Sequence, residues 1–134
     1  MRYRRALLLA GIIGAGLFVL NTFANWYGWY DHISFFDKGM HVLGGVFVAC
    51  ALIWCFFRYC SVQWLQTASA LFIGALLIGL LWEAYEYIVQ GITGAHLATV
   101  PDSIGDLIAD AIGAALGILL CWRKRSGTIG GNER

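Results

Sequence analysis

The sequence predicts an all-α fold, an integral membrane bundle of four transmembrane helices that forms a single membrane domain over residues 1–134. Hydrophobic residues make up 60% of the chain and charged residues only 13%, and a soluble domain of this length could not bury so much apolar surface in one core. The apolar residues also form unbroken runs, as in residues 70–81, whereas membrane-spanning strands alternate polar and apolar residues. A lipid bilayer is therefore the expected solvent for most of the chain.

Four apolar segments are each close to the ~20 residues that a helix needs to cross the ~30 Å hydrocarbon core of a bilayer. They cover about residues 6–24, 38–59, 66–90 and 103–122, and residues 123–134 are expected to form a cytoplasmic tail. The first segment follows a basic stretch, as in a signal peptide, but its length is nearer to that of a membrane span. We therefore expect it to be the first helix.

The composition also excludes other classes of protein. A formal net charge of +1 lacks the basic surplus of a nucleic-acid-binding protein, and the chain is too hydrophobic to be disordered. The four cysteines lie in or beside apolar runs without a Cys-x-x-Cys pair, so we interpret them as small buried residues rather than as zinc ligands. They are Cys50, Cys55, Cys60 and Cys121.

Basic residues predict the orientation of the helices. Arginine and lysine gather in residues 2–5, at Arg58 and in residues 123–125, and cytoplasmic loops carry an excess of these residues. Both termini should therefore be cytoplasmic, and we expect a multi-pass protein of the bacterial inner membrane. The outer loops then cover about residues 25–37, which are rich in Trp and Tyr, and 91–102.

Acidic residues follow a different pattern, because seven of the eight fall on the outer side or in the outer half of the bilayer. Those within the predicted helices repeat at spacings that place each set on one helix face. A carboxylate facing lipid costs several kcal/mol, so these faces should point into the bundle. The resulting cluster consists of Asp37 and His41 (i, i+4), Glu83 and Glu86 (i, i+3), and Asp106 and Asp110 (i, i+4).

These carboxylates cannot all stay ionised in a space of low dielectric constant without compensation, and Lys38 is the only basic side chain nearby. A divalent cation would compensate them, and oxygen ligands with one imidazole suit Mg²⁺, Mn²⁺, Zn²⁺ or Fe²⁺. The predicted metal ligands are Asp37, His41, Glu83, Glu86, Asp106 and Asp110. The alternatives are a protonated hydrogen-bond network that only ties the helices together and a pathway for protons or cations. Among the neighbouring aromatic residues, Tyr87 is expected to hydrogen-bond within the site.

A metal in this position predicts a metal-dependent hydrolase or transferase that acts on a lipid-linked or envelope substrate, with Glu83 or Glu86 as the catalytic base. Two other functions remain open: a small proton-coupled or cation transporter, and a non-catalytic envelope protein that binds lipid or a glycopeptide antibiotic. The expected partners are membrane lipid and a second copy of the chain in a homo-oligomer, with no nucleic acid.

Three short motifs on successive predicted helices carry a resemblance to a known family. An Asp-Lys-x-x-His helix start at residues 37–41 precedes a Glu-x-x-Glu pair at 83–86 and a Ser-x-x-Asp-x-x-x-Asp stretch at 103–110 that is followed by glycine. The chain resembles the VanZ-like superfamily of small bacterial membrane proteins over about residues 37–117. Glu86 and Asp110 replace the Gln and Asn of VanZ itself, which indicates the YjdF-type branch. The resemblance implies a membrane site but no particular substrate.

The predicted topology can be tested with two probes. A topology reporter fused after residue 125 should give the signal of a cytoplasmic location. A cysteine introduced by Gly94→Cys should react with a membrane-impermeant maleimide added to intact cells. Labelling of that cysteine only after permeabilisation would contradict the orientation.

Overall fold

The computed structural model describes residues 2–94 and 99–121, and these residues contain helices and turns but no strand. Four of the described helices are long and apolar enough to cross a membrane. This confirms the predicted all-α fold with four candidate spans. In chain order the elements are α1 (Arg2–Tyr27), a short α2 (Trp29–His32), α3 (Phe36–Tyr59), the 3-10 turn η1 (Gln63–Gln66), α4 (Ala68–Thr93) and α5 (Val100–Cys121).

Local sequence signals explain where α4 begins and ends. Thr67 is its N-cap, and the threonine hydroxyl accepts a hydrogen bond of 3.3 Å from the Ala70 backbone N–H. The helix therefore begins after residue 66, where the prediction had placed its start. At the other end Gly94 adopts a left-handed conformation with φ of 73°, which ends the helix. Residue 122 and the predicted tail at 123–134 lie outside the described residues.

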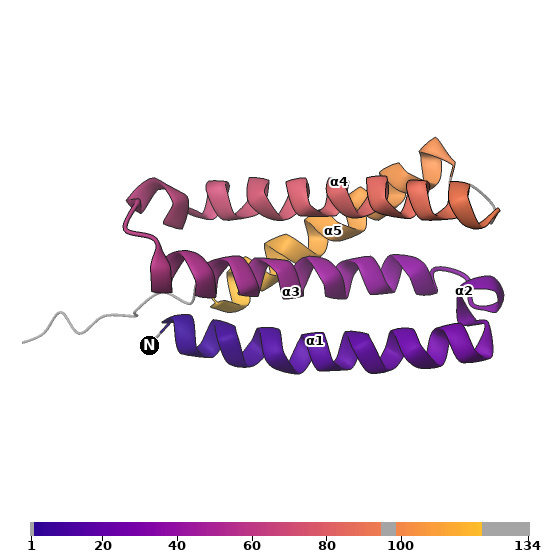
Figure 1. The fold of residues 1–134 in the computed structure, drawn as a ribbon. Coiled ribbons are helices and arrows are strands. Elements are labelled where there is room, and N and C mark those ends of the chain that lie inside the picture. Colours follow the sequence, from indigo (N-terminus) through magenta and orange to yellow (C-terminus); the bar gives the residue numbers. More distant parts are fainter. Residues whose placement is uncertain (1, 95–98, 122–134) are drawn as a thin grey trace, which may run out of the picture.

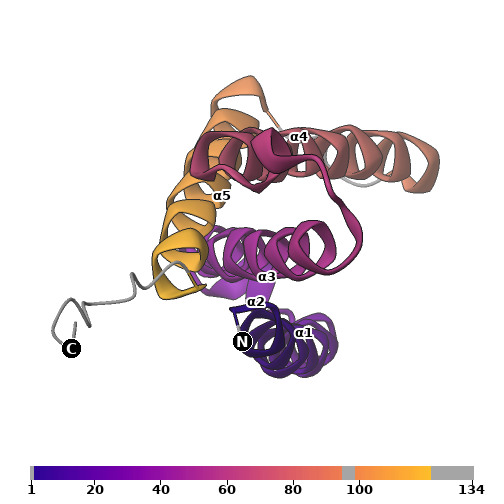
Figure 2. The ribbon, with the colours of Figure 1, turned by 90° about the vertical axis from the view of Figure 1, so that its left-hand side faces the viewer.

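The long helix α3 is the centre of the bundle (Figure 1). It packs against α5 along much of its length and against α1 on another face, while α4 contacts both α5 and α3. Helices α1 and α4 lie on opposite sides of α3 (Figure 2) and do not touch each other. The start of α1 and the end of α5 lie at the same end of the bundle, and α2 lies at the opposite end (Figure 1). The acidic ends of α3, α4 and α5 therefore gather at the α2 end.

Glycines allow α3 and α5 to approach closely. A Cβ atom on Gly45 would collide with the backbone carbonyl of Asp110, and one on Gly113 would collide with the carbonyl of Val42. One turn further along α5, a Cβ on Gly117 would lie 2.9 Å from the Cβ of Ala49. Small residues at these positions bring the two backbones into contact, so Gly113 and Gly117 are packing residues of the α3–α5 interface.

Helix α1 is attached less intimately. Gly14 faces Phe47 of α3, but Gly11 and Gly16 have no atom of another element within 4 Å. Gly14 therefore packs against α3, whereas Gly11 and Gly16 lie on a part of α1 that no other described element covers. Large apolar side chains such as Phe18, which is 74% exposed, cover the outer face of α1. Self-association of the chain stays a prediction.

The core away from the α2 end is built from small apolar side chains. Ala49, Cys50 and Ile53 of α3 are buried against α4 and α5 residues such as Leu71. The Sγ atoms of Cys50 and Cys121 lie 3.3 Å apart, and all four cysteines are free thiols. Cys50 and Cys121 therefore match the interpretation as small buried residues, while Cys55 and Cys60 are only half-buried.

The contact between α3 and α5 predicts a large effect of one methyl group. Gly113→Ala should lower the free energy of unfolding by about 1–3 kcal/mol, because the new Cβ must push the two backbones apart. Gly16→Ala is the matched control in α1, since its Cβ meets no neighbouring atom, and it should leave the melting temperature unchanged or slightly higher. Thermal unfolding in detergent measures both. Equal melting temperatures for the two variants would contradict the packing described here.

Candidate functional site

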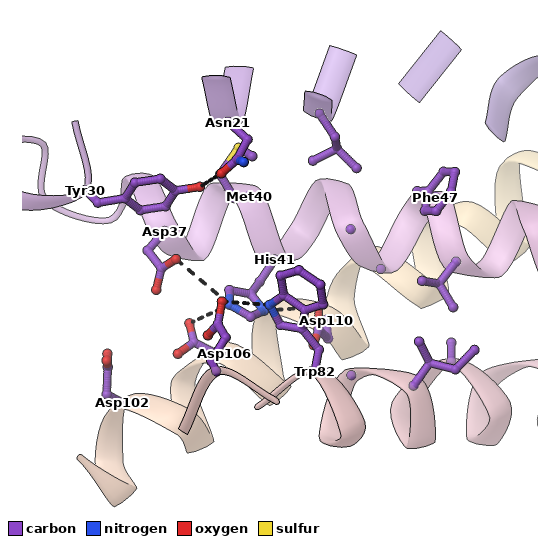
Figure 3. Close-up of a pocket in the computed structure, with 18 of the residues that line it drawn as sticks. Asn21, Tyr30, Asp37, Met40, His41, Phe47, Trp82, Asp102, Asp106 and Asp110 are labelled. Carbon is purple, nitrogen blue, oxygen red and sulfur yellow. Dashed lines mark hydrogen bonds and ion pairs between the residues drawn. The ribbon is translucent and has the colours of Figure 1, made fainter. Parts of the chain in front are cut away.

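The imidazole of His41 is the centre of the acidic cluster at the α2 end of the bundle. It is only 6% exposed, and both ring nitrogens face carboxylates. On one side, Nδ1 lies 3.4 Å from Oδ1 of Asp110. On the other side, Nε2 lies between oxygens of three residues: Asp106 at 3.6 Å, Glu83 at 3.7 Å and Asp37 at 3.9 Å. Figure 3 shows Asp37, Asp106 and Asp110 arranged around this ring.

Three helix ends supply these groups. Asp37 and His41 are four residues apart in the first turns of α3, so both lie on the same helix face. Asp106 and Asp110 have the same spacing in α5, and the glycine contact of α5 with α3 brings them against the imidazole. Glu83 lies on the buried face of α4. The structure thus brings the sequence-predicted residues together from separate elements.

Lys38 neutralises the outer edge of the cluster. Its Nζ atom donates hydrogen bonds of 2.6 Å to Oδ1 of Asp102 and to Oδ1 of Asp106. The Asp106 side chain is 3% exposed, whereas that of Asp102 is half exposed. A buried carboxylate needs a paired charge and hydrogen bonds, and Lys38 supplies both to Asp106 across the contact between α3 and α5.

Two oxygen atoms in the cluster have no hydrogen-bond partner. They are Oε1 of Glu83 and Oδ2 of Asp110, in residues that are 8% and 7% exposed. A buried acceptor without a partner costs about 1–3 kcal/mol, and more when it is charged. The two residues lie on opposite sides of the imidazole, Glu83 near Nε2 and Asp110 near Nδ1. The hydrogen bonds of Lys38 go instead to Asp102 and Asp106.

Glu86 has a different environment from Glu83. The Trp82 indole Nε1 donates a hydrogen bond of 2.8 Å to Oε1 of Glu86, one turn away on α4. Tyr87, which was expected to bond within the site, is instead 58% exposed, so that expectation is wrong. Trp82 and Glu86 are four residues apart, and so are Glu83 and Tyr87, so helical spacing alone does not decide which aromatic residue bonds to a glutamate.

Tyr30 lies beside the cluster and was not expected from the sequence. Its hydroxyl group donates a hydrogen bond of 2.8 Å to Oδ1 of Asn21, visible at the upper left of Figure 3. Partial burial, and then the nearby charges of Asp37 and Glu86, raise the pKa of the Tyr30 hydroxyl above its usual value. The hydroxyl therefore remains a protonated donor at neutral pH. Neither residue belongs to a periodic polar pattern, which is why sequence reasoning missed them.

Two sets of side chains are close enough to share a metal ion, with ligand atoms within 4.8 Å of one another. One set is Asp37, His41 and Asp106, and the other is His41, Glu83 and Glu86. Both sets contain His41, and neither contains Asp110, which lies on the Nδ1 side of the ring. The metal-binding role of all six residues and the catalytic role of Glu83 or Glu86 remain predictions.

A family model described as "Predicted membrane protein (DUF2238)" matches residues 5–127. The chain belongs to this family. YjdF-type proteins are a DUF2238 family, so the resemblance to that branch is confirmed. Family membership and the apolar helices together make the chain a multi-pass membrane protein. Neither curated proteins nor solved structures gave a match.

The cluster of this DUF2238 protein opens into a cavity of about 860 Å³. Asp37, His41, Asp106 and Asp110 line one end, and Glu86 also lies on the wall. Glu83 is not among the residues that line the cavity. A molecule in the cavity would therefore meet Glu86 but not Glu83.

The position of Asp110 in the DUF2238 protein predicts a coupling between two helices. A Cβ on Gly79 of α4 would collide with Oδ2 of Asp110, so Gly79→Ala should displace this carboxylate from His41 and lower the melting temperature. In the double variant with Asp110→Ala the collision is absent, and the two effects should be less than additive by about 0.5–3 kcal/mol. Gly74→Ala on the same helix is the control, because its new Cβ meets only the flexible end of Leu52. Its effect on stability should add to that of Asp110→Ala. Additive effects of Gly79→Ala and Asp110→Ala would contradict this geometry.

Proposed function

We propose that the cluster binds one divalent cation through Nε2 of His41. The observation that carries this proposal is the asymmetry of the imidazole. The Asp110 carboxylate can accept a hydrogen bond from Nδ1–H of a neutral imidazole. The lone pair of Nε2 is then directed at the other carboxylates. Histidines that bind metal are generally oriented in this way by a carboxylate on the second nitrogen. In this proposal Asp110, although first predicted to be a ligand, orients His41.

The distances around Nε2 support a shared ion. Ligands that bind a tetrahedral metal at about 2.1 Å lie roughly 3.4 Å from one another. The Nε2–oxygen distances of 3.6–3.9 Å are only slightly longer, and no direct hydrogen bond closes them. Small side-chain rotations would bring these atoms to coordination distance.

The set with Glu83 and Glu86 is the better candidate for the ion. Asp106 already accepts a hydrogen bond from Lys38, whereas Oε1 of Glu83 has no partner. Because one nitrogen of His41 binds one metal, the geometry favours a single ion. The ligand set of carboxylates and one imidazole suits Mg²⁺, Mn²⁺, Zn²⁺ or Fe²⁺.

The reaction that fits this site is hydrolysis or group transfer on a lipid-linked or envelope substrate. A divalent cation would polarise an acyl or phosphoryl oxygen and make bound water a stronger acid. Glu86 lines the cavity, so it is the candidate general base as well as a ligand, while Glu83 would only hold the ion. The Trp82 indole keeps the Glu86 carboxylate in place.

The location of the site follows from charge. Arg4, Arg5 and Arg58 belong to the end of the bundle opposite the cluster, and basic residues favour the cytoplasmic side. The cluster would then open at the outer leaflet of a bacterial inner membrane, with both termini cytoplasmic. Membership of the wider VanZ-like superfamily is part of the same proposal.

A transporter is the less favoured function. Below the cluster, the buried described residues of α3, α4 and α5 are apolar or glycine, such as Val46, Ala75 and Ala114, apart from two thiols. A proton or cation pathway would need polar groups at that depth. The described residues offer no such pathway.

The metal proposal is tested by thermal stability after chelation and readdition of Mg²⁺, Mn²⁺ or Zn²⁺. The parent protein should gain stability with at least one ion, because a ligand that binds only the folded state stabilises it. Glu83→Gln and Glu86→Gln should lose this gain. Asp110→Asn should retain it at about 10–100-fold weaker affinity, since the residue acts through His41.

Tyr85→Phe is the control, because Tyr85 is 56% exposed on α4 and lies outside both ligand sets and outside the cavity lining. It should respond to metal as the parent does. If the parent melts at the same temperature with chelator and with every ion, the metal proposal is wrong. In that case the carboxylates hold protons or only tie the helices together, and Glu83→Gln should be neutral or stabilising.

A further inference from the structure

The cavity beside the cluster has two chemically different ends. At the α2 end its wall carries carboxylates from α2, α3, α4 and α5. Towards the middle of the bundle the wall is apolar and consists of Leu17, Phe47, Val48, Ala75 and Ile78. Figure 3 shows this division, with the labelled acids at one end of α3 and Phe47 further along the helix. A volume of about 860 Å³ falls within the range of ~300–1,000 Å³ that is typical of small-molecule sites.

The apolar end is open towards the membrane. Leu17 belongs to α1 and Ile78 to α4, and these two helices lie on opposite sides of α3 without touching (Figure 2). The described helices α3 and α5 contact both of them, and Figure 2 shows no helix between α1 and α4 on the side of α3 away from α5. An alkyl chain could therefore enter from the bilayer between α1 and α4 and lie on the face of α3 that Phe47 and Val48 form.

The charge at the polar end selects the headgroup. The acidic lining residues are Asp31, Asp37, Glu86, Asp102, Asp106 and Asp110, and His41 is the only lining residue with a basic side chain. Asp110 is nine-tenths buried and keeps one oxygen without a hydrogen-bond partner. An anionic headgroup would be repelled here, whereas a cationic one would be attracted even if one divalent ion were bound.

Two aromatic rings on the same wall favour the same headgroup. Tyr30 and Trp82 both line the cavity, and each has its polar hydrogen engaged, by Asn21 and Glu86 respectively. Both residues can still offer the ring, and the Tyr30 oxygen can still accept a hydrogen bond from an N–H group of a ligand. A ring face beside carboxylates attracts an ammonium group by about 0.5–2 kcal/mol.

We propose that the cavity binds an amphiphile with an apolar chain and an ammonium headgroup, the chain lying between α1 and α4 and the ammonium lying among the carboxylates near Tyr30 and Trp82. This inference rests on the proposed function, since the amphiphile would be the substrate class of the same site. It adds the nature of the headgroup and the route of entry.

The test compares three probes that share a chain and differ in the headgroup: dodecylamine, dodecanoic acid and dodecanol. Binding to the full-length protein in a nonionic detergent is measured by calorimetry against a micelle blank. Dodecylamine should bind at least tenfold more tightly than the other two. Equal affinities for the three probes, or a preference for the acid, would overturn the inference.

A pair of variants tests where the alkyl chain of the ligand lies. Ile78→Trp should weaken dodecylamine binding at least tenfold, because the larger ring fills the apolar end of the cavity. Leu77→Trp is the matched control, since Leu77 is 56% exposed on the same helix and does not line the cavity. Equal binding by the two variants would overturn the proposed place of the chain.

Measuring each affinity with chelator and again with saturating Mn²⁺ separates this inference from the metal proposal. Selective binding of dodecylamine by a protein that binds no metal would support the ligand class and refute the metal site. Metal binding without selectivity among the three probes would refute the ligand class alone.

Discussion

The close contact between α3 and α5 is the constraint on which the site depends. Gly45 and Gly113 have no side chain, so the backbones of the two helices touch where a Cβ would collide. That contact places His41 of α3 between Asp106 and Asp110 of α5. A wider spacing would separate the imidazole from both carboxylates and would remove Lys38 from Asp106. The positions of the charged groups in the cluster therefore depend directly on how closely α3 and α5 pack.

Some carboxylate oxygens of the cluster have a hydrogen-bond donor and others have none. Lys38 compensates the charges of Asp102 and Asp106 and donates a hydrogen bond of 2.6 Å to each. Trp82 donates a hydrogen bond to Glu86. Glu83 has no comparable donor for Oε1. A merely structural network would be less costly with a residue that leaves no buried acceptor without a hydrogen bond. A site that binds a cation accounts for the same oxygen without that cost.

Much of this could be predicted from the sequence because helical periodicity carries the information. The spacing of Asp37 and His41, and of Asp106 and Asp110, fixes a shared face on each helix, and the direction of successive spans puts those faces at one level. Periodicity does not encode which rotamer a side chain takes or which helices touch. The hydrogen bond from Trp82 to Glu86, in place of one from Tyr87, was missed for that reason.

The gap between α1 and α4 was equally beyond prediction, because nothing in the apolar pattern of either helix says whether its partner is protein or lipid. Within membranes the hydrophobic effect does not drive helices together, so they need small residues or polar contacts to pack. Helix α1 contacts α3 through Gly14, but no described contact draws it to α4. The bundle consequently keeps one side of its acidic cavity open to the bilayer. Carboxylates that are inaccessible to lipid in a closed bundle can, in this arrangement, meet the headgroup of a molecule whose chain never leaves the membrane.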